Sequence, residues 1–253
     1  MPIIQSLDRA LRILDLFDEH NKELKITEIS STLQLNKSTT HSLLKTLKQH
    51  NYIKQNSDSG KYSLGLKFIE KGQLVLNSMD IRTVARDYLI DLSTSTGQTA
   101  HLVILEGKFG VYIDKVEGAS TIVYSRIGRR VPIHSSAVGK VLIGYKPKDE
   151  IDNLLDNYDF HRQTENTILS KEAFMNELQE VVQKGLAVDN EENEPGVYCL
   201  AVPIFNHDGA VIAAISVSTT IFSLTDELKG NIVTNLKEIG LAISYQLGYR
   251  QSS

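Results

Sequence analysis

Apolar residues recur at helical spacing along the first fifty positions of the chain. From Leu7 onward, residues 6–17 place them at i, i+3, i+4, i+7 and i+10, which predicts a helix with one buried face. Two further helices are predicted over 27–33 and 37–50, separated by a turn at 34–36. Two helices joined by so short a turn form a helix-turn-helix, whose second helix enters the DNA major groove. The pattern therefore predicts a DNA-reading helix over 37–50.

A hairpin is predicted directly after these helices. Residues 52–55 and 61–64 have the character of short strands, and the polar, glycine-containing segment 56–60 joins them as a turn. A hairpin in this place is typical of a wing, which contacts the DNA backbone or the minor groove. The order of elements predicts a winged helix-turn-helix DNA-binding domain over residues 1–76, although some winged helices bind proteins instead.

The predicted DNA-facing surface combines the start of the helix 37–50 with lysines on that helix and beside the wing. Short hydroxyl side chains at a helix start add donors to the positive end of the helix; the alternative is that they only cap the helix or face solvent. The candidate DNA-binding residues are Lys37, Ser38, Thr39, Thr40, His41, Ser42, Lys45, Lys48, Lys54 and Lys61.

Charge is unevenly distributed along the chain. The 253 residues have a formal net charge of -4, yet residues 36–71 carry seven Lys and Arg against two Asp and Glu. A basic segment in an acidic chain is the expected footprint of a small phosphate-contacting module, although such a run is often only a solvated face.

Beyond the wing, the pattern predicts a linker helix and then a mixed domain. Residues 81–92 keep helical spacing without a break and predict a linker helix over 77–96, which could dock on its own second domain or pair two subunits. In residues 97–253, segments with the apolar spacing of strands are followed by segments with that of helices, and then by strands again. This order predicts an α+β domain over 97–253 with a mainly antiparallel sheet. Strands are expected at 99–105, 111–116, 121–125, 186–189, 198–205 and 210–218, and helices at 136–144, 148–156, 171–185 and over the C-terminal region.

Several segments resemble the IclR family of bacterial transcriptional regulators, in the order in which the family has them and over nearly the whole chain. They are Ser6–Leu14, Lys37–Thr39 with Leu43–Leu47, Lys61–Leu66, Val131–Lys140, Asp189–Val202, Ala213–Ser218 and Leu247–Tyr249. The resemblance implies a winged helix, a linker helix and a GAF-like effector-binding domain, assembled as a homodimer or a dimer of dimers on a double-stranded DNA operator. It also implies a small-molecule effector pocket lined by Val123, Val131, Ala137, Val138, Asp189, Val197, Cys199, Ser216 and Ser218.

Two positions depart from the family pattern. Ser42 stands where the family usually has an arginine, so the base preference of other members does not carry over. Residues 160–164 stand where the family often has a Tyr-Thr pair, which leaves this connection open.

The implied pocket has a physical rationale. Residues 138–140 lie near a predicted helix start, where free amides bind a carboxylate. Ser216 and Ser218 alternate with apolar residues, so both hydroxyls point to one sheet face; the alternative is that they pack against a helix. A pocket of this kind suits a small organic acid or a hydroxylated metabolite. The predicted function is a transcriptional regulator, with repression favoured over activation because it is the commoner mode in the family.

An enzyme is the main competing interpretation. His134, Ser135, Ser136, Asp189 and Cys199 include a nucleophile and its helpers, but no G-x-S-x-G elbow, phosphate-binding loop or metal-ligand spacing surrounds them. We therefore expect no catalytic residue, no metal and no cofactor, and we expect His134 to hold a loop by hydrogen bonding.

The remaining composition predicts a cytoplasmic protein. A single cysteine excludes an intramolecular disulfide and fits a reducing compartment. No apolar stretch is long enough to span a bilayer, and the N-terminus lacks the layout of a signal peptide.

Overall fold

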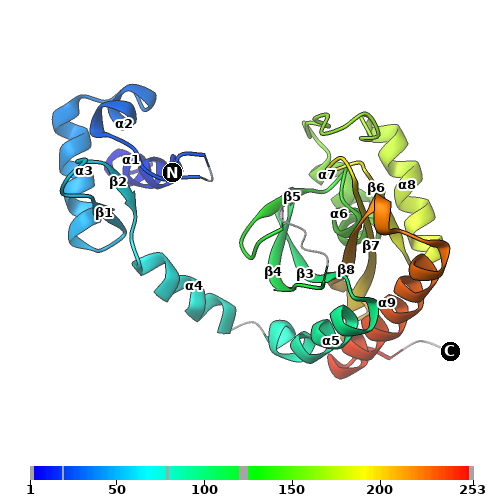
Figure 1. Ribbon diagram of the computed structural model, residues 1–253. Coiled ribbons are helices and arrows are strands. Elements are labelled where there is room, and N and C mark those ends of the chain that lie inside the picture. The colour runs from blue at the N-terminus through cyan, green and yellow to red at the C-terminus, as the bar shows by residue number, and fades with distance from the viewer. Residues whose placement is uncertain (1–2, 19, 78–79, 120–124, 251–253) are drawn as a thin grey trace. The chain divides into compact units, whose positions relative to one another are not determined.

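The helices expected at the N-terminus are present in the computed structural model, which describes residues 3–18, 20–77, 80–119 and 125–250 (Figure 1). The chain forms two units, Met1–Ser78 and Met79–Ser253. The elements of the first unit are α1 (Gln5–Leu14), α2 (Ile26–Thr32), α3 (Lys37–Gln49), β1 (Ile53–Gln55), β2 (Tyr62–Leu64) and α4 (Lys67–Asn77).

The first unit has the predicted winged-helix fold. Ile13, Ile29 and Leu44, one from each of the first three helices, meet in a core with Ile53 and Tyr62 of the hairpin. Strands β1 and β2 pair antiparallel. The four residues between α2 and α3 form a sharp turn that includes Gln34 at a φ of 54°. The hydrophobic stripes on the helices and the wing therefore stabilise one another around a single core.

The second unit is built on a six-stranded antiparallel sheet with the order β5-β4-β3-β8-β7-β6. Its strands are β3 (Thr99–Glu106), β4 (Phe109–Val116), β5 (Arg130–Pro132), β6 (Ala187–Asn190), β7 (Val197–Phe205) and β8 (Val211–Thr220). Its helices are α5 (Asp80–Thr96), α6 (Ala137–Gly144), α7 (Lys148–Leu154), α8 (Lys171–Lys184), a 3-10 turn (Ile221–Ser223) and α9 (Asp226–Gln246). The predicted α+β class with an antiparallel sheet is confirmed.

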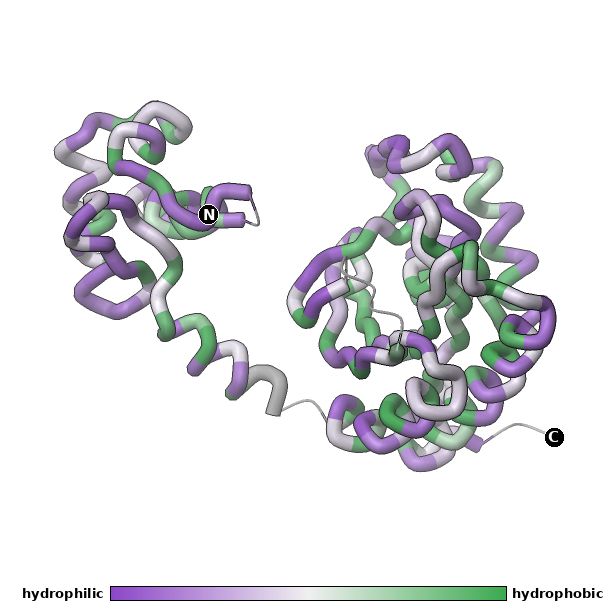
Figure 2. The backbone as a smooth tube through the Cα atoms, in the orientation of Figure 1, coloured by the Kyte–Doolittle hydropathy of each residue, from purple (hydrophilic) through white to green (hydrophobic). Residues whose placement is uncertain are grey.

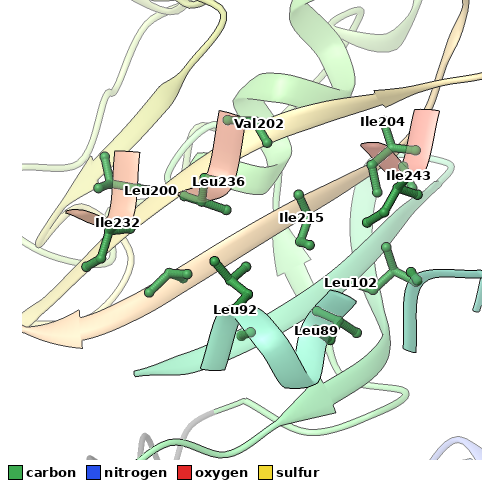
Figure 3. Close-up of a cluster of buried hydrophobic side chains, with 14 of the residues drawn as sticks. Leu89, Leu92, Leu102, Leu200, Val202, Ile204, Ile215, Ile232, Leu236 and Ile243 are labelled. Atoms are coloured by element: carbon green, nitrogen blue, oxygen red, sulfur yellow. The ribbon is translucent and has the colours of Figure 1, made fainter. Parts of the chain in front are cut away.

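Helices α5 and α9 cover one face of the sheet. Leu89 and Leu92 of α5 point toward Leu102 and Ile215 of the sheet and toward Leu236 of α9 (Figure 3). Apolar and polar positions alternate along both helices, as expected of helices with one buried face (Figure 2). The stripe 81–92 thus docks on its own domain, which is the first of the two alternatives left open by the sequence. Within the segment 77–96 predicted as a linker, Asn77 ends α4 of the first unit and α5 (Asp80–Thr96) belongs to the second unit, and the role of this segment as a linker stays a prediction.

Close approach of α9 to the sheet depends on one glycine. A Cβ atom at Gly240 would lie 2.7 Å from Cγ2 of Val202 on β7. A side chain there would require Val202 or α9 to shift.

Helices α6 and α8 lie on the opposite face, where a second cluster surrounds Val103, Val141, Val181 and Ala201. The strand expected at 121–125 falls almost wholly outside the described residues, and the short strand at Arg130–Pro132 pairs with β4 instead. No helix within the described ranges is long and apolar enough to cross a lipid bilayer.

Candidate functional sites: a DNA-facing helix and a buried pocket

Helix α3 presents most of its predicted DNA-binding residues to solvent. Side chains of Lys37, Ser38, His41, Ser42, Lys45 and Lys48 are exposed, and Thr39 is half-buried. Lys54 on the wing is exposed and Lys61 is half-buried. The Lys48 ammonium donates a hydrogen bond to Oε1 of Gln55 at 3.2 Å, which ties α3 to the wing. Helix start, lysines and wing therefore belong to one unit and are available for DNA.

Thr40 is an exception to the predicted surface. Its exposed fraction is 0%, and its hydroxyl donates to the carbonyl of Asn36 at 3.2 Å. A side chain with no accessible area cannot contact a base edge, so the expectation that Thr40 binds DNA is wrong. It packs in the interior of the first unit on the same helix stripe as Leu44.

The second unit encloses a cavity of about 250 Å³. Eight of the nine residues implied as pocket residues line it, and the ninth, Val123, lies outside the described residues. The eight are Val131, Ala137, Val138, Asp189, Val197, Cys199, Ser216 and Ser218. That they contact an effector stays a prediction.

Strand register explains why residues so far apart in sequence meet here. Cys199 on β7 stands opposite Asp189 on β6 and opposite Ser218 on β8. Cross-strand partners point to the same face of an antiparallel sheet. The Cys199 thiol and the Ser218 hydroxyl lie 3.0 Å apart. One row of side chains therefore forms the floor of the cavity.

The start of α6 forms one wall of the cavity. The Ser136 hydroxyl accepts from the N–H of Gly139 at 3.2 Å and donates to the carbonyl of Pro132 at 2.6 Å. A Cβ atom at Gly139 would lie 2.4 Å from the Cα of Ile133, so only glycine permits this packing. The N–H groups of Ala137 and Val138 stand in the first helical turn, where the helix itself supplies no acceptor.

The cavity also contacts residues that the sequence did not single out. Tyr112 comes from β4, and Arg129 and Arg130 come from the segment entering β5. The adjacent arginines beside Val131 are a signal in the sequence, whereas Ser125, Gln163, Asn193 and Glu194 lie outside helices and strands, where no periodicity indicates which way a side chain faces. The lining residues that the sequence did not assign to the pocket are Tyr112, Ser125, Arg129, Arg130, Pro132, Ser136, Gln163, Asn193 and Glu194.

Asp189 carries the most perturbed carboxyl of the cavity. Burial raises the pKa of Asp189 to about 7, although its Oδ1 accepts from the N–H groups of Glu192 at 2.8 Å and Asn193 at 3.3 Å. Near neutral pH, this side chain exchanges between an acceptor and a donor form. It can therefore face either a hydroxyl or an anionic oxygen of a ligand.

Asp189→Asn should stabilise the protein by an amount that grows with pH. Since folding raises the pKa from about 4 to about 7, the native state favours the protonated form. Stability from this group is fully present below about pH 4 and is lost as the pH rises toward about 7. Thermal unfolding should show the variant's advantage widening from about pH 5 to 7 and then levelling off. An advantage that is equal at all these pH values would contradict the prediction.

The side chains considered for catalysis make other contacts. His134 pairs through Nδ1 with the Tyr158 hydroxyl at 2.8 Å and through Nε2 with the His161 carbonyl at 3.0 Å, so it joins two loops. The Ser135 hydroxyl donates to Oδ1 of Asn193 at 3.1 Å. Burial raises the pKa of the Cys199 thiol and keeps it uncharged. Within the described part of the chain, no group of three or more His, Cys, Asp and Glu side chains could hold a metal ion.

Comparison with known proteins decides the family. A family model of the IclR helix-turn-helix domain matches residues 6–57, and the model for the C-terminal domain of the bacterial transcriptional regulator IclR matches residues 73–245. The chain belongs to the IclR family. It is a DNA-binding transcriptional regulator, and its second unit is the effector domain of the IclR family.

Relatives in the IclR family cover the chain almost end to end. The HTH-type transcriptional regulator XynR of Escherichia coli K12 is 52% identical over 250 residues, which span 98% of this chain and 99% of XynR. The regulator KdgR of the same strain is 38% identical, over 97% of this chain and 94% of KdgR. The crystal structure of Thermotoga maritima IclR has a TM-score of 0.79 and 35% identity, with 98% of this chain and all of that chain covered.

Proposed function

We propose that the protein is a repressor that binds its operator as a homodimer and responds to a small hydroxylated organic acid in the cavity of its second unit. The observation that carries this proposal is the cavity itself, with eight of the nine implied residues around it. Its volume of about 250 Å³ is near the lower end for small-molecule sites. DNA is the partner, so the protein is expected to act in the cytoplasm.

The chemistry of the cavity favours an acid. Amides of Ala137 and Val138 stand at a helix start, where the helix dipole favours negative charge. Arg129 and Arg130 are among the lining residues, and the Arg130 guanidinium is paired with Glu106 at 2.8 Å. Arg129 is paired with Glu194 at 3.2 Å, so this charge is partly balanced before a ligand enters. A ligand carboxylate is expected at this side of the cavity.

The strand residues that line the cavity favour hydroxyl groups. Ser216 and Ser218 offer hydroxyls that can donate or accept. Asp189 would repel a second carboxylate when ionised, whereas it accepts a hydrogen bond from a ligand hydroxyl. Apolar walls from Val131 and Val197 limit the size of the ligand. Together these groups favour a hydroxylated monocarboxylic acid.

We infer that the cavity binds its ligand and does not transform it. The Ser135 hydroxyl donates to the side-chain oxygen of Asn193, and the Ser136 hydroxyl donates to the carbonyl of Pro132. Burial keeps the Cys199 thiol uncharged. None of them is paired with a base at hydrogen-bond distance within the described residues. This supports a regulator without enzymatic activity.

The route from the cavity to the first unit begins at β4. Tyr112 on this strand lines the cavity, and Asp114, two residues farther along, is buried. Asp114 Oδ1 accepts from Arg86 of α5 at 2.7 Å, and Oδ2 lies 3.4 Å from Nε of Arg82. Because α5 follows the first unit in the chain, a shift of β4 would move the point where that unit is attached. A ligand changes DNA binding only if it binds more tightly to one of two positions of β4 and α5 than to the other.

The pairing surface of the homodimer is proposed on α1 and α4. The stripe of α5, expected from the sequence to pair subunits or couple domains, is used inside its own unit. Leu7 and Leu11 on α1 are 56% and 54% exposed, and Ile69 on α4 is 69% exposed. Apolar side chains so exposed at helical spacing mark an interaction surface. An operator with two half-sites needs two such units.

Replacing Leu7 and Leu11 by lysine should convert the dimer to a monomer. Two buried charges without partners would oppose pairing, and operator affinity should fall with the loss of the second half-site. Light scattering measures the mass, and Ser6→Lys, which adds a charge to the same helix, serves as the control. A double variant that remains dimeric would place the pairing surface elsewhere.

The proposed function itself is tested by selecting genomic DNA fragments with the wild-type protein. We expect recovery of fragments that share a near-palindromic sequence, because a symmetric dimer reads two equivalent half-sites. Recovery of fragments without a common sequence would contradict an operator-binding repressor. The genes beside the recovered sites would also indicate the metabolite.

A further inference from the structure

A fully buried lysine lies behind the wall of the cavity. Lys140 is on α6, one turn after Ala137, and its side chain is 1% exposed. Its ammonium donates to Oε1 of Glu192 at 2.6 Å, to Oε1 of Glu177 at 2.9 Å and to the carbonyl of Val188 at 2.7 Å. An ammonium has three donors, and all three are used.

The partners of Lys140 come from three different elements. Glu177 belongs to α8 and Val188 to β6, whereas Glu192 belongs to the loop between β6 and β7. Burying a charge is costly, and an apolar side chain of similar size often stabilises a fold as well. Packing alone therefore does not explain why this position carries a charge. The charge is better explained by the three elements that the Lys140 ammonium joins.

Glu192 connects this ammonium to the cavity. It stands between Asp189 and Asn193, which both line the cavity, and its N–H donates to Oδ1 of Asp189 at 2.8 Å. Its carbonyl accepts from the Thr167 hydroxyl at 2.8 Å. The loop is thus fixed at Glu192 from both its backbone and its side chain. Glu192 therefore sets the positions of Asp189 and Asn193, which line the cavity.

We propose that Lys140 is a positioning residue for the effector site, acting through Glu192 on the loop that carries Asn193 and on the orientation of Asp189. The assignment of the cavity as an effector site rests on the proposed function. Glu177 shares the same ammonium but is not among the described residues that line the cavity. The two carboxylates therefore form a matched pair for experiment, one on the loop and one away from it.

Hydrogen–deuterium exchange of the free full-length protein tests the positioning role without any ligand. In Glu192→Gln, amides of residues 189–197 should exchange at least about tenfold faster than in the wild type, because a charge-assisted hydrogen bond that holds the loop closed is weakened. In Glu177→Gln the same amides should exchange as in the wild type. Equal acceleration in both variants, or none in Glu192→Gln, would overturn the proposal.

A second arm measures ligand binding as the shift in melting temperature caused by glycolate, glycerate or gluconate. The shift in melting temperature should be as large in Glu177→Gln as in the wild type, and most of it should be lost in Glu192→Gln. If Lys140 only stabilised the fold, the shift would be smaller by the same amount in both variants. If none of these acids shifts the wild type, the proposed ligand class fails, and amide exchange still decides the role of Lys140. Lys140→Met should match Glu192→Gln in exchange; if it does not fold, the two glutamine variants remain decisive.

Discussion

Alanine at Lys45, Lys48, Lys54 and Lys61 together is expected to lower operator affinity about a thousandfold at moderate salt, because phosphate contacts dominate binding to DNA. The four ammonium groups belong to α3 and the wing, which form one unit around a shared core. The dependence of affinity on salt should also weaken, by about one unit of slope for each lysine that contacts a phosphate.

A control with the same change of net charge separates contact from long-range attraction. Lys148, Lys171, Lys184 and Lys229 are exposed lysines of the second unit. Their joint replacement by alanine should leave operator affinity and its salt slope nearly unchanged. If the variant with alanine at Lys45, Lys48, Lys54 and Lys61 retains specific binding at moderate salt, these lysines do not form the DNA-facing surface.

Alanine at Ser216 and Ser218 is expected to abolish the response to the effector while operator binding remains intact. Both serines line the cavity of the second unit, whereas the predicted DNA-binding residues belong to the first unit. A coupling between effector and DNA commonly changes affinity about 5- to 150-fold, and this factor should fall close to one in the double variant.

Thr219→Val provides the matched control for the serines. Thr219 is a buried hydroxyl residue on the same strand, and the alternation of a strand directs it to the face opposite Ser218. This variant should respond like the wild type. A double serine variant that responds normally would show that the two serines serve packing and that the effector contacts lie elsewhere.

Local periodicity is sufficient to predict the winged helix and the α+β class of the second unit. The winged helix follows from helical spacing up to residue 50 and a turn cluster at 56–60, since each of these signals lies within a few neighbouring residues. The same spacing held information that was not used: Thr40 precedes Leu44 by four positions and shares its buried stripe. The hydroxyl of Thr40 favours a DNA contact, whereas its place on an apolar stripe indicates burial, and the structure shows it buried.

The lining of the cavity is harder to predict from the sequence than the fold. Asp189, Cys199 and Ser218 meet because β6, β7 and β8 are neighbours in the sheet, and strand order is not encoded in the spacing of any one strand. Those residues came from the family resemblance. The sequence does not show which face Tyr112 occupies, because the register of β3 against β4 shifts at Leu102 and Val103 and interrupts the alternation of the two faces.

The most direct test of the account is the affinity of the wild-type dimer for its selected operator, measured by fluorescence anisotropy with and without glycolate, glycerate, lactate or gluconate. We expect specific binding without acid, and a decrease of about 5- to 150-fold in affinity with at least one of these acids. Specific binding that no acid changes, together with no shift of melting temperature by any of them, would contradict a repressor controlled by a hydroxylated acid.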